Sequence, residues 1–205
     1  MIVYVESNFI LEVALEQEQF ASAEAILKLV EENKIKLAFP SFALSEPFAT
    51  VMRRDKERSV LIESLTVTLR QLQRSEPDKQ IALVLQPLLV LLQDAKDAVS
   101  GEFSRLHSTV ARLLKIGTSI ELDESTLEQA KNYQRLFNLK PQDSIIYSTI
   151  IADMQRRPYG EMKCFLSRDR KAFSTNPGIR SELASYNGRY IGNFAQGLSF
   201  IQHEL

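Results

Sequence analysis

The sequence has few cysteines, histidines and glycines, and each shortage excludes a class of function. The single cysteine, Cys164, excludes a disulfide framework and a cysteine-rich zinc site, and it indicates a reducing compartment, with the cytoplasm as the default expectation. The seven glycines form neither of the two glycine-rich patterns that cradle nucleotide phosphates. The two histidines, His107 and His203, have no nucleophile beside them, so we interpret both as structural.

Long hydrophobic runs are also absent. The most apolar stretch, residues 81–92, contains a glutamine and a proline and is much shorter than the roughly 20 apolar residues that a bilayer span needs. We interpret it as a buried helix, and we expect no membrane association. The first residues reach a carboxylate at Glu6 and lack the charged and apolar regions of a signal peptide, so secretion is not expected.

Charge is balanced over the whole chain, because 25 basic and 26 acidic side chains occur among 205 residues. This balance argues against a protein that binds polyanions over its whole surface. Residues 156–189 differ, since eight basic and three acidic side chains give this stretch an excess of five positive charges. Such an excess is typical either of a surface that faces phosphate groups or of an ordinary solvated surface, and both interpretations stay open.

The order of elements predicted within the first fifty residues is strand, helix, helix, strand, helix. Residues 2–5 and 35–39 are short apolar runs typical of strands, residues 20–30 show the apolar spacing of a helix, and Pro40 opens the next helix. This alternation predicts an α/β fold with a mostly parallel central sheet, built as one domain over 1–205. Further strands are predicted at 119–122, 163–167 and 190–191, and further helices at 124–137, from Pro141, and at the end of the chain.

A helical insertion is predicted over 53–117, because no strand-like run interrupts this stretch and leucines recur there at helical spacing. Turn signals at 75–78 and at Ser100-Gly101 divide it into two or three helices packed as hairpins. The leucines exceed what two exposed helices need. We therefore expect an apolar surface used for self-association, with a homodimer as the simpler case, or for a partner helix.

Four carboxylates occupy comparable places in this pattern. Each follows a predicted strand or lies near the start of a predicted helix, where the carboxyl ends of parallel strands form a crevice: Glu6, Glu46, Asp143 and Asp169. Carboxylates brought together repel each other, so the cluster requires a cation, and oxygen ligands favour Mg²⁺ or Mn²⁺. Taken singly, each carboxylate also has a structural interpretation, as a helix cap, as a partner of a helix dipole or as an exposed side chain.

Four short motifs in this order resemble the PIN-domain nucleases: residues 2–10, 39–46, 141–146 and 166–169, in a resemblance that covers roughly 1–52 and 118–205. The resemblance implies a three-layer α/β/α fold and a Mg²⁺- or Mn²⁺-dependent nuclease, with RNA as the expected substrate and hydrolysis within the strand. It places Glu6, Glu46, Asp143 and Asp169 on the family's four acidic positions, and Ser7, Asn8 and Ser167 on the polar positions beside them, from which they could orient carboxylates or a water. The basic side chains that could hold flanking phosphates are Arg168, Arg170 and Lys171.

Two features depart from the family pattern. Glu6 stands where the family typically has aspartate, so its carboxylate reaches one methylene further and favours Mn²⁺ over the more demanding Mg²⁺. The insertion at 53–117 is longer than in compact members and could cover, narrow or dimerise over the site. An alternative function is therefore a non-catalytic PIN-like scaffold that binds RNA or a protein, and membership of a toxin–antitoxin pair stays open. A phosphatase is disfavoured, because the strand-end Asp-x-Asp pair of such enzymes is missing.

Overall fold

The structure is a computed structural model that describes residues 1–75 and 79–205. It forms two compact units. The first comprises Met1–Pro47 together with Ser108–Leu205, and the second comprises Phe48–His107.

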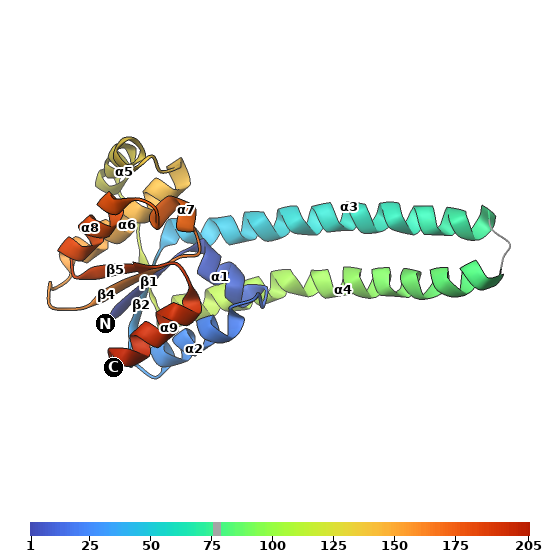
Figure 1. The fold of residues 1–205 in the computed structure, drawn as a ribbon, viewed down its shortest axis with the longest axis horizontal. Coiled ribbons are helices and arrows are strands. Elements are labelled where there is room, and N and C mark those ends of the chain that lie inside the picture. The colour runs from blue at the N-terminus through green and yellow to red at the C-terminus, as the bar shows by residue number, and fades with distance from the viewer. Residues whose placement is uncertain (76–78) are drawn as a thin grey trace. The chain divides into compact units, whose positions relative to one another are not determined.

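The first unit contains a five-stranded sheet in which every strand pair is parallel (Figure 1). The central strand pairs on both sides, with Tyr4 in register with Ala38 on one neighbour and with Phe165 on the other. The order across the sheet is β3-β2-β1-β4-β5, and the strands are β1 (Ile2–Val5), β2 (Lys36–Pro40), β3 (Thr118–Ile120), β4 (Lys163–Leu166) and β5 (Gly188–Ile191). The predicted parallel α/β class is thus confirmed.

Helices cover both faces of this sheet and complete a three-layer α/β/α arrangement (Figure 1). One layer consists of α1 (Ser7–Ala14), α2 (Phe20–Glu31) and α9 (Phe194–His203). The other consists of α5 (Glu124–Phe137), α6 (Pro141–Arg156) and α8 (Pro177–Ser185). The short helices η1 (Ser41–Leu44) and α7 (Arg170–Phe173) follow β2 and β4.

Apolar side chains from both faces of the strands form the core. Tyr4 and Phe165 pack on one face in a cluster with Tyr147 and other side chains of α6. On the other face α9 approaches β4 so closely that a Cβ on Gly197 would lie 2.7 Å from a methyl carbon of Leu166. Only glycine fits there without displacing the leucine. β1 and β4 are buried along their whole lengths, and apart from Lys163 at the start of β4 their sequences are continuously apolar rather than alternating.

Left-handed asparagines end two of the helices at the predicted breaks. Asn33 follows α2 with φ of 56°, and Asn138 follows α5 with φ of 54°. Asparagine is among the few residues that adopt this conformation readily, so both helices stop there. Pro141 then begins α6, where its missing N–H costs nothing because the first turn of a helix has no acceptor for it.

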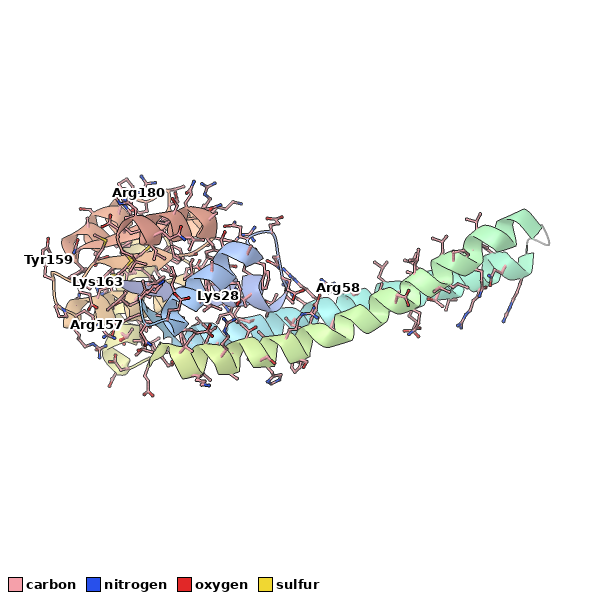
Figure 2. All side chains as sticks on the ribbon, turned by 90° about the horizontal axis from the view of Figure 1, so that it is seen from below. Lys28, Arg58, Arg157, Tyr159, Lys163 and Arg180 are labelled. Carbon is pink, nitrogen blue, oxygen red and sulfur yellow. The ribbon has the colours of Figure 1, made fainter. Side chains whose placement is uncertain are left out.

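The second unit is a hairpin formed by parts of α3 (Ser45–Ser75) and α4 (Lys79–Ile116) (Figure 1). An ion pair of 2.6 Å joins Arg58, labelled in Figure 2, to Glu102, and the ring of Phe48 packs edge-on against Phe103. Of the predicted turn at 75–78, residues 76–78 lie outside the described residues. The break predicted at Ser100-Gly101 is wrong, because α4 continues through both residues.

The expected buried character of residues 81–92 holds for Leu85, which is 7% exposed, but is wrong for most of the side chains that the structure describes there. This stretch is helical, but Val84, Leu88 and Leu91 are 63%, 42% and 62% exposed. Its apolar character therefore supplies surface as well as core. No helix in the described part of the chain is long and apolar enough to cross a membrane.

Candidate active site at the carboxyl edge of the sheet

The candidate site lies where the chain leaves β1 and β4. From β1 the strand order runs outward through β2 and β3 on one side, and through β4 and β5 on the other. This reversal leaves a crevice beyond the carboxyl ends of β1 and β4, the place where open parallel sheets bind ligands. Glu6 comes directly after β1, and Ser167 comes directly after β4.

Glu6 is fixed by the helix that it begins. It is the N-cap of α1, and the backbone N–H of Asn8 donates a hydrogen bond of 3.0 Å to its Oε2 atom. Ser7 is the first residue of α1, and its hydroxyl donates a hydrogen bond to the backbone oxygen of Ala43, 3.1 Å away.

The second oxygen of Glu6 receives no hydrogen bond from any residue that the structure describes. Glu6 is only 4% exposed, and within the described residues its buried Oε1 atom accepts no hydrogen bond. Burial raises the pKa of Glu6 to about 7, an effect that the Asn8 backbone and the nearby Ser167 hydroxyl offset only in part. The carboxylate of Glu46 raises it further. A buried carboxylate oxygen without a partner is costly, unless a cation or another donor reaches it.

Asp143 lies half-buried in the first turn of α6. Burial raises its pKa to about 6, and repulsion from Asp169 and from Glu46 adds to the shift, while Lys140 opposes it. A carboxylate in the first turn of a helix is ordinarily stabilised by the helix dipole. The raised pKa therefore reflects how strongly its surroundings disfavour another negative charge.

Asp169 caps the helix that follows β4. Its Oδ1 atom accepts a 2.9 Å hydrogen bond from the backbone N–H of Ala172, and its own N–H donates to the hydroxyl of Ser167 at 3.0 Å. The structural interpretation of Asp169 as a helix cap is thus correct. It does not exclude a second role, because the cap also fixes the position of the carboxylate beside Asp143.

The four predicted carboxylates are therefore brought into mutual electrostatic contact. Repulsion links Glu6 with Glu46, Glu46 with Asp143, and Asp143 with Asp169. In the described residues, however, no three histidine, cysteine, aspartate or glutamate side chains are placed to hold one metal ion together. The geometry is that of a carboxylate cluster rather than of a closed metal cage.

Of the three predicted phosphate contacts, one is already engaged inside the protein. The guanidinium of Arg168 is bound by the fully buried carboxylate of Glu12 and, at 3.1 Å, by Glu18. We therefore do not retain Arg168 as a phosphate contact. Arg170 and Lys171 are both exposed.

Tyr190 is a member of the site that sequence reasoning missed. Its hydroxyl donates a 2.8 Å hydrogen bond to the backbone oxygen of Ser167. Burial raises the pKa of Tyr190 well above its ordinary value, and the carboxylates of Asp169 and Glu6 raise it further. The sequence marked this residue only as part of a short strand, and no local signal showed that β5 pairs with β4.

Comparison with known families identifies one match. The family model described as "PIN domain" matches residues 3–173, most of the chain. That range includes all four predicted carboxylates and ends before α8, β5 and α9. Comparisons with curated proteins and with solved structures found no match.

Proposed function

Since the chain belongs to the PIN-domain family, whose members are typically nucleases, we propose that it is a divalent-metal-dependent nuclease that hydrolyses RNA within the strand. The observation that supports this most directly is the buried Oε1 atom of Glu6, which lies among repelling carboxylates and accepts no hydrogen bond from the described residues. Helix capping accounts for Oε2 of Glu6 and for Asp169, but not for the burial of Oε1 of Glu6 among other carboxylates. This burial is explained if the cluster binds a positive ion.

The donor set fits Mg²⁺ or Mn²⁺. Glu6, Glu46, Asp143 and Asp169 offer only carboxylate oxygens, the ligands that these two ions prefer. A divalent cation would give the unpartnered oxygen of Glu6 a partner and would relieve the repulsion that raises the pKa of Asp143. When bound, the cation supplies an activated water and neutralises charge on the phosphate that is attacked.

The protein's own groups hold two of the four carboxylates, those of Glu6 and Asp169. The Asn8 backbone leaves one oxygen of Glu6 free by binding the other, and Ser7 ties the start of α1 to the segment after β2. Ser167 supports the loop that carries Asp169. These contacts position Glu6 and Asp169 before any substrate arrives, and such positioning favours catalysis.

The test is cleavage of a labelled single-stranded RNA with Mg²⁺, with Mn²⁺ and with EDTA. We expect cleavage with either metal, none with EDTA, and a loss of about a hundredfold or more in Asp143→Asn, as for removal of a metal ligand. Glu128→Gln, an exposed carboxylate of α5, is the matched control and should cleave as the wild type does. Equal activity in the wild type and Asp143→Asn would reveal a contaminating nuclease.

One observation favours a second function, that of a PIN-like scaffold which binds RNA or a protein without cleaving. No three of the described acidic side chains are placed to hold one ion, so side chains must move before the cluster can share a cation. If wild-type protein cleaves no RNA with either metal and Glu6→Asp restores nothing, the scaffold becomes the better interpretation.

A further inference from the structure

A basic pocket lies next to the carboxylate cluster. It has a volume of about 350 Å³, inside the range of small-ligand sites, roughly 300–1,000 Å³. Three arginines from three different elements line it, Arg170 of α7, Arg180 of α8 and Arg189 of β5. Its other lining residues are uncharged: Ser174, Tyr190, Ile191, Gly192, Gln196 and Phe200.

Two of the three guanidiniums, those of Arg180 and Arg189, are held in place by uncharged groups. Arg180, labelled in Figure 2, donates a 2.6 Å hydrogen bond to the backbone oxygen of Ser174, and Arg189 lies over the ring of Phe200 at 5.2 Å. Within the described parts of the chain, none of the three arginines forms an ion pair with a carboxylate. Three like charges around one pocket repel each other, and an anion bound between them would reduce this repulsion.

The pocket shares a wall with the candidate active site. Arg170 follows Asp169 directly, and Tyr190 reaches from the pocket lining to the backbone of Ser167. Gly192 makes this approach possible, because a Cβ there would lie 3.1 Å from the Tyr190 hydroxyl and 3.2 Å from Cγ of Arg170. An extended ligand bound at the carboxylates therefore passes next to the arginines.

We propose that Arg170, Arg180 and Arg189 bind a backbone phosphodiester of the nucleic-acid strand, adjacent to the phosphodiester that is cut. This inference rests on the proposed nuclease function and adds a substrate subsite to it. The guanidinium group matches phosphate through two parallel hydrogen bonds, so arginines suit this ligand better than lysines. Arg180 and Arg189 lie beyond residues 3–173, so two of the three arginines of the subsite belong to the part of the chain that the family model does not match.

A contact to a backbone phosphate reads neither base nor sugar. The subsite therefore binds single-stranded RNA and single-stranded DNA of any sequence, and it sets the direction of the strand across the carboxylates. A terminal phosphate would present similar chemistry to the arginines. Oligonucleotides with and without a 5′-phosphate therefore distinguish binding of a backbone phosphate from binding of a terminal phosphate.

The experiment measures equilibrium binding of labelled single-stranded oligonucleotides to the full chain in EDTA, where no cleavage occurs. We expect Arg180→Gln and Arg189→Gln each to weaken binding about tenfold, the effect of losing one charge-assisted hydrogen-bonded contact. Each should also reduce the slope of log affinity against log salt by about 0.7. Arg135→Gln, an exposed arginine of α5 outside the pocket, is the matched control and should bind as the wild type does.

The loss must be equal for RNA, for DNA, and for strands with or without a 5′-phosphate. A loss confined to 5′-phosphorylated strands would overturn the assignment to the backbone. Arg180→Glu reverses the charge of an exposed side chain and should weaken binding further, with an unchanged circular-dichroism melting curve showing that the fold is intact.

Cleavage separates this inference from the proposed function. In the presence of metal, the arginine variants should raise KM and leave kcat nearly unchanged, because the contact is equally strong before and during the reaction. If the wild type cleaves RNA but the arginine variants bind and cleave normally, the subsite is wrong and the nuclease stands. If neither the wild type nor any variant cleaves RNA, but the arginine variants lose binding to RNA and DNA equally, the phosphate subsite stands and the proposed nuclease function is wrong.

Discussion

The hydroxyl of Tyr190 donates a 2.8 Å hydrogen bond to the backbone oxygen of Ser167, and this bond joins the end of β5 to the loop that carries Asp169. Because Ser167 also accepts the N–H of Asp169 through its hydroxyl, a short chain of contacts runs from β5 to the carboxylate cluster. Tyr190 thus positions Asp169 indirectly, through Ser167.

Removing only this hydroxyl tests the positioning role. Tyr190→Phe keeps the ring that packs against Phe165 and Phe173, so we expect a stability loss of about 1 kcal/mol, the usual net value of one hydrogen bond. We expect cleavage to fall through kcat rather than KM, since the loop loses its support. Urea unfolding and steady-state cleavage measure the two effects, and a variant with unchanged kcat would contradict the role.

The pH dependence of stability without metal should report the burial of Glu6. Its pKa in the folded protein is about 7, above its ordinary value of 4.5, so the folded state binds the proton more tightly. The contribution of Glu6 to stability is therefore complete below about pH 4.5 and is lost as the pH rises through 7. The whole effect is of order 3 kcal/mol at most.

Glu6→Gln isolates this contribution, because Asp143 changes stability in the same direction and is present in both proteins. In EDTA, the difference in unfolding free energy between Glu6→Gln and the wild type should shift in favour of the variant between pH 5 and pH 8. Chemical denaturation at several pH values measures it. A difference that does not vary with pH would show that Glu6 titrates normally.

Local sequence predicted the acidic positions, because each lies directly after a strand or at a helix start. Glu6 and Asp169 are fixed by turns of three or four residues, which a motif captures in full. The ion pair that engages Arg168 could not be predicted from local sequence, because its partner Glu12 lies 156 residues away. The sequence did not single out Arg180 and Arg189 for the same reason. Only the pairing of β4 with β5, which are distant from β1 in sequence, brings this part of the chain near the carboxylates.

The error at Gly101 has a different cause. Glycine inside a helix costs about 1 kcal/mol relative to alanine, a penalty that one residue in a long helix tolerates. Contacts across the hairpin, such as the pair of Arg58 with Glu102 directly after this glycine, favour the continuous helix. Turn propensity therefore failed where tertiary packing outweighed it.

The length of the Glu6 side chain should determine the preferred metal. Mg²⁺ requires nearly ideal octahedral geometry at about 2.0–2.1 Å, whereas Mn²⁺ tolerates irregular oxygen ligands better. We expect wild-type cleavage to be faster with Mn²⁺, and Glu6→Asp to raise cleavage with Mg²⁺. Glu6→Gln should fall between the wild type and Asp143→Asn. Rates at matched metal concentrations measure this, and a faster wild-type reaction with Mg²⁺ would refute it.

The hairpin of α3 and α4 carries two exposed apolar stripes. The stripes consist of Leu61, Leu65 and Leu72 on α3, and of Val84, Leu88 and Leu91 on α4, with exposed fractions of 42–63%. Each helix also has a less exposed row, at 62, 66, 69 and 73 on α3 and at 85, 89 and 92 on α4, and every stripe residue comes one position before a residue of that row. Because the two helices run in opposite directions, this equal offset puts both stripes on the same side of the hairpin.

A pair of helices needs only one apolar row each, whereas a helix in a larger bundle needs a wider apolar face. We therefore expect a second copy of the chain to supply the missing helices, in a two-fold dimer of hairpins. Each buried leucine or valine would contribute roughly 1.5–3 kcal/mol. Leu88→Glu should weaken dimerisation at least tenfold in light scattering over a range of concentrations, while Ser64→Glu, which adds the same charge at an exposed position of α3 outside the stripe, should not. A wild-type monomer at tens of micromolar would overturn the dimer, because association that weak could not be driven by six apolar side chains on each copy.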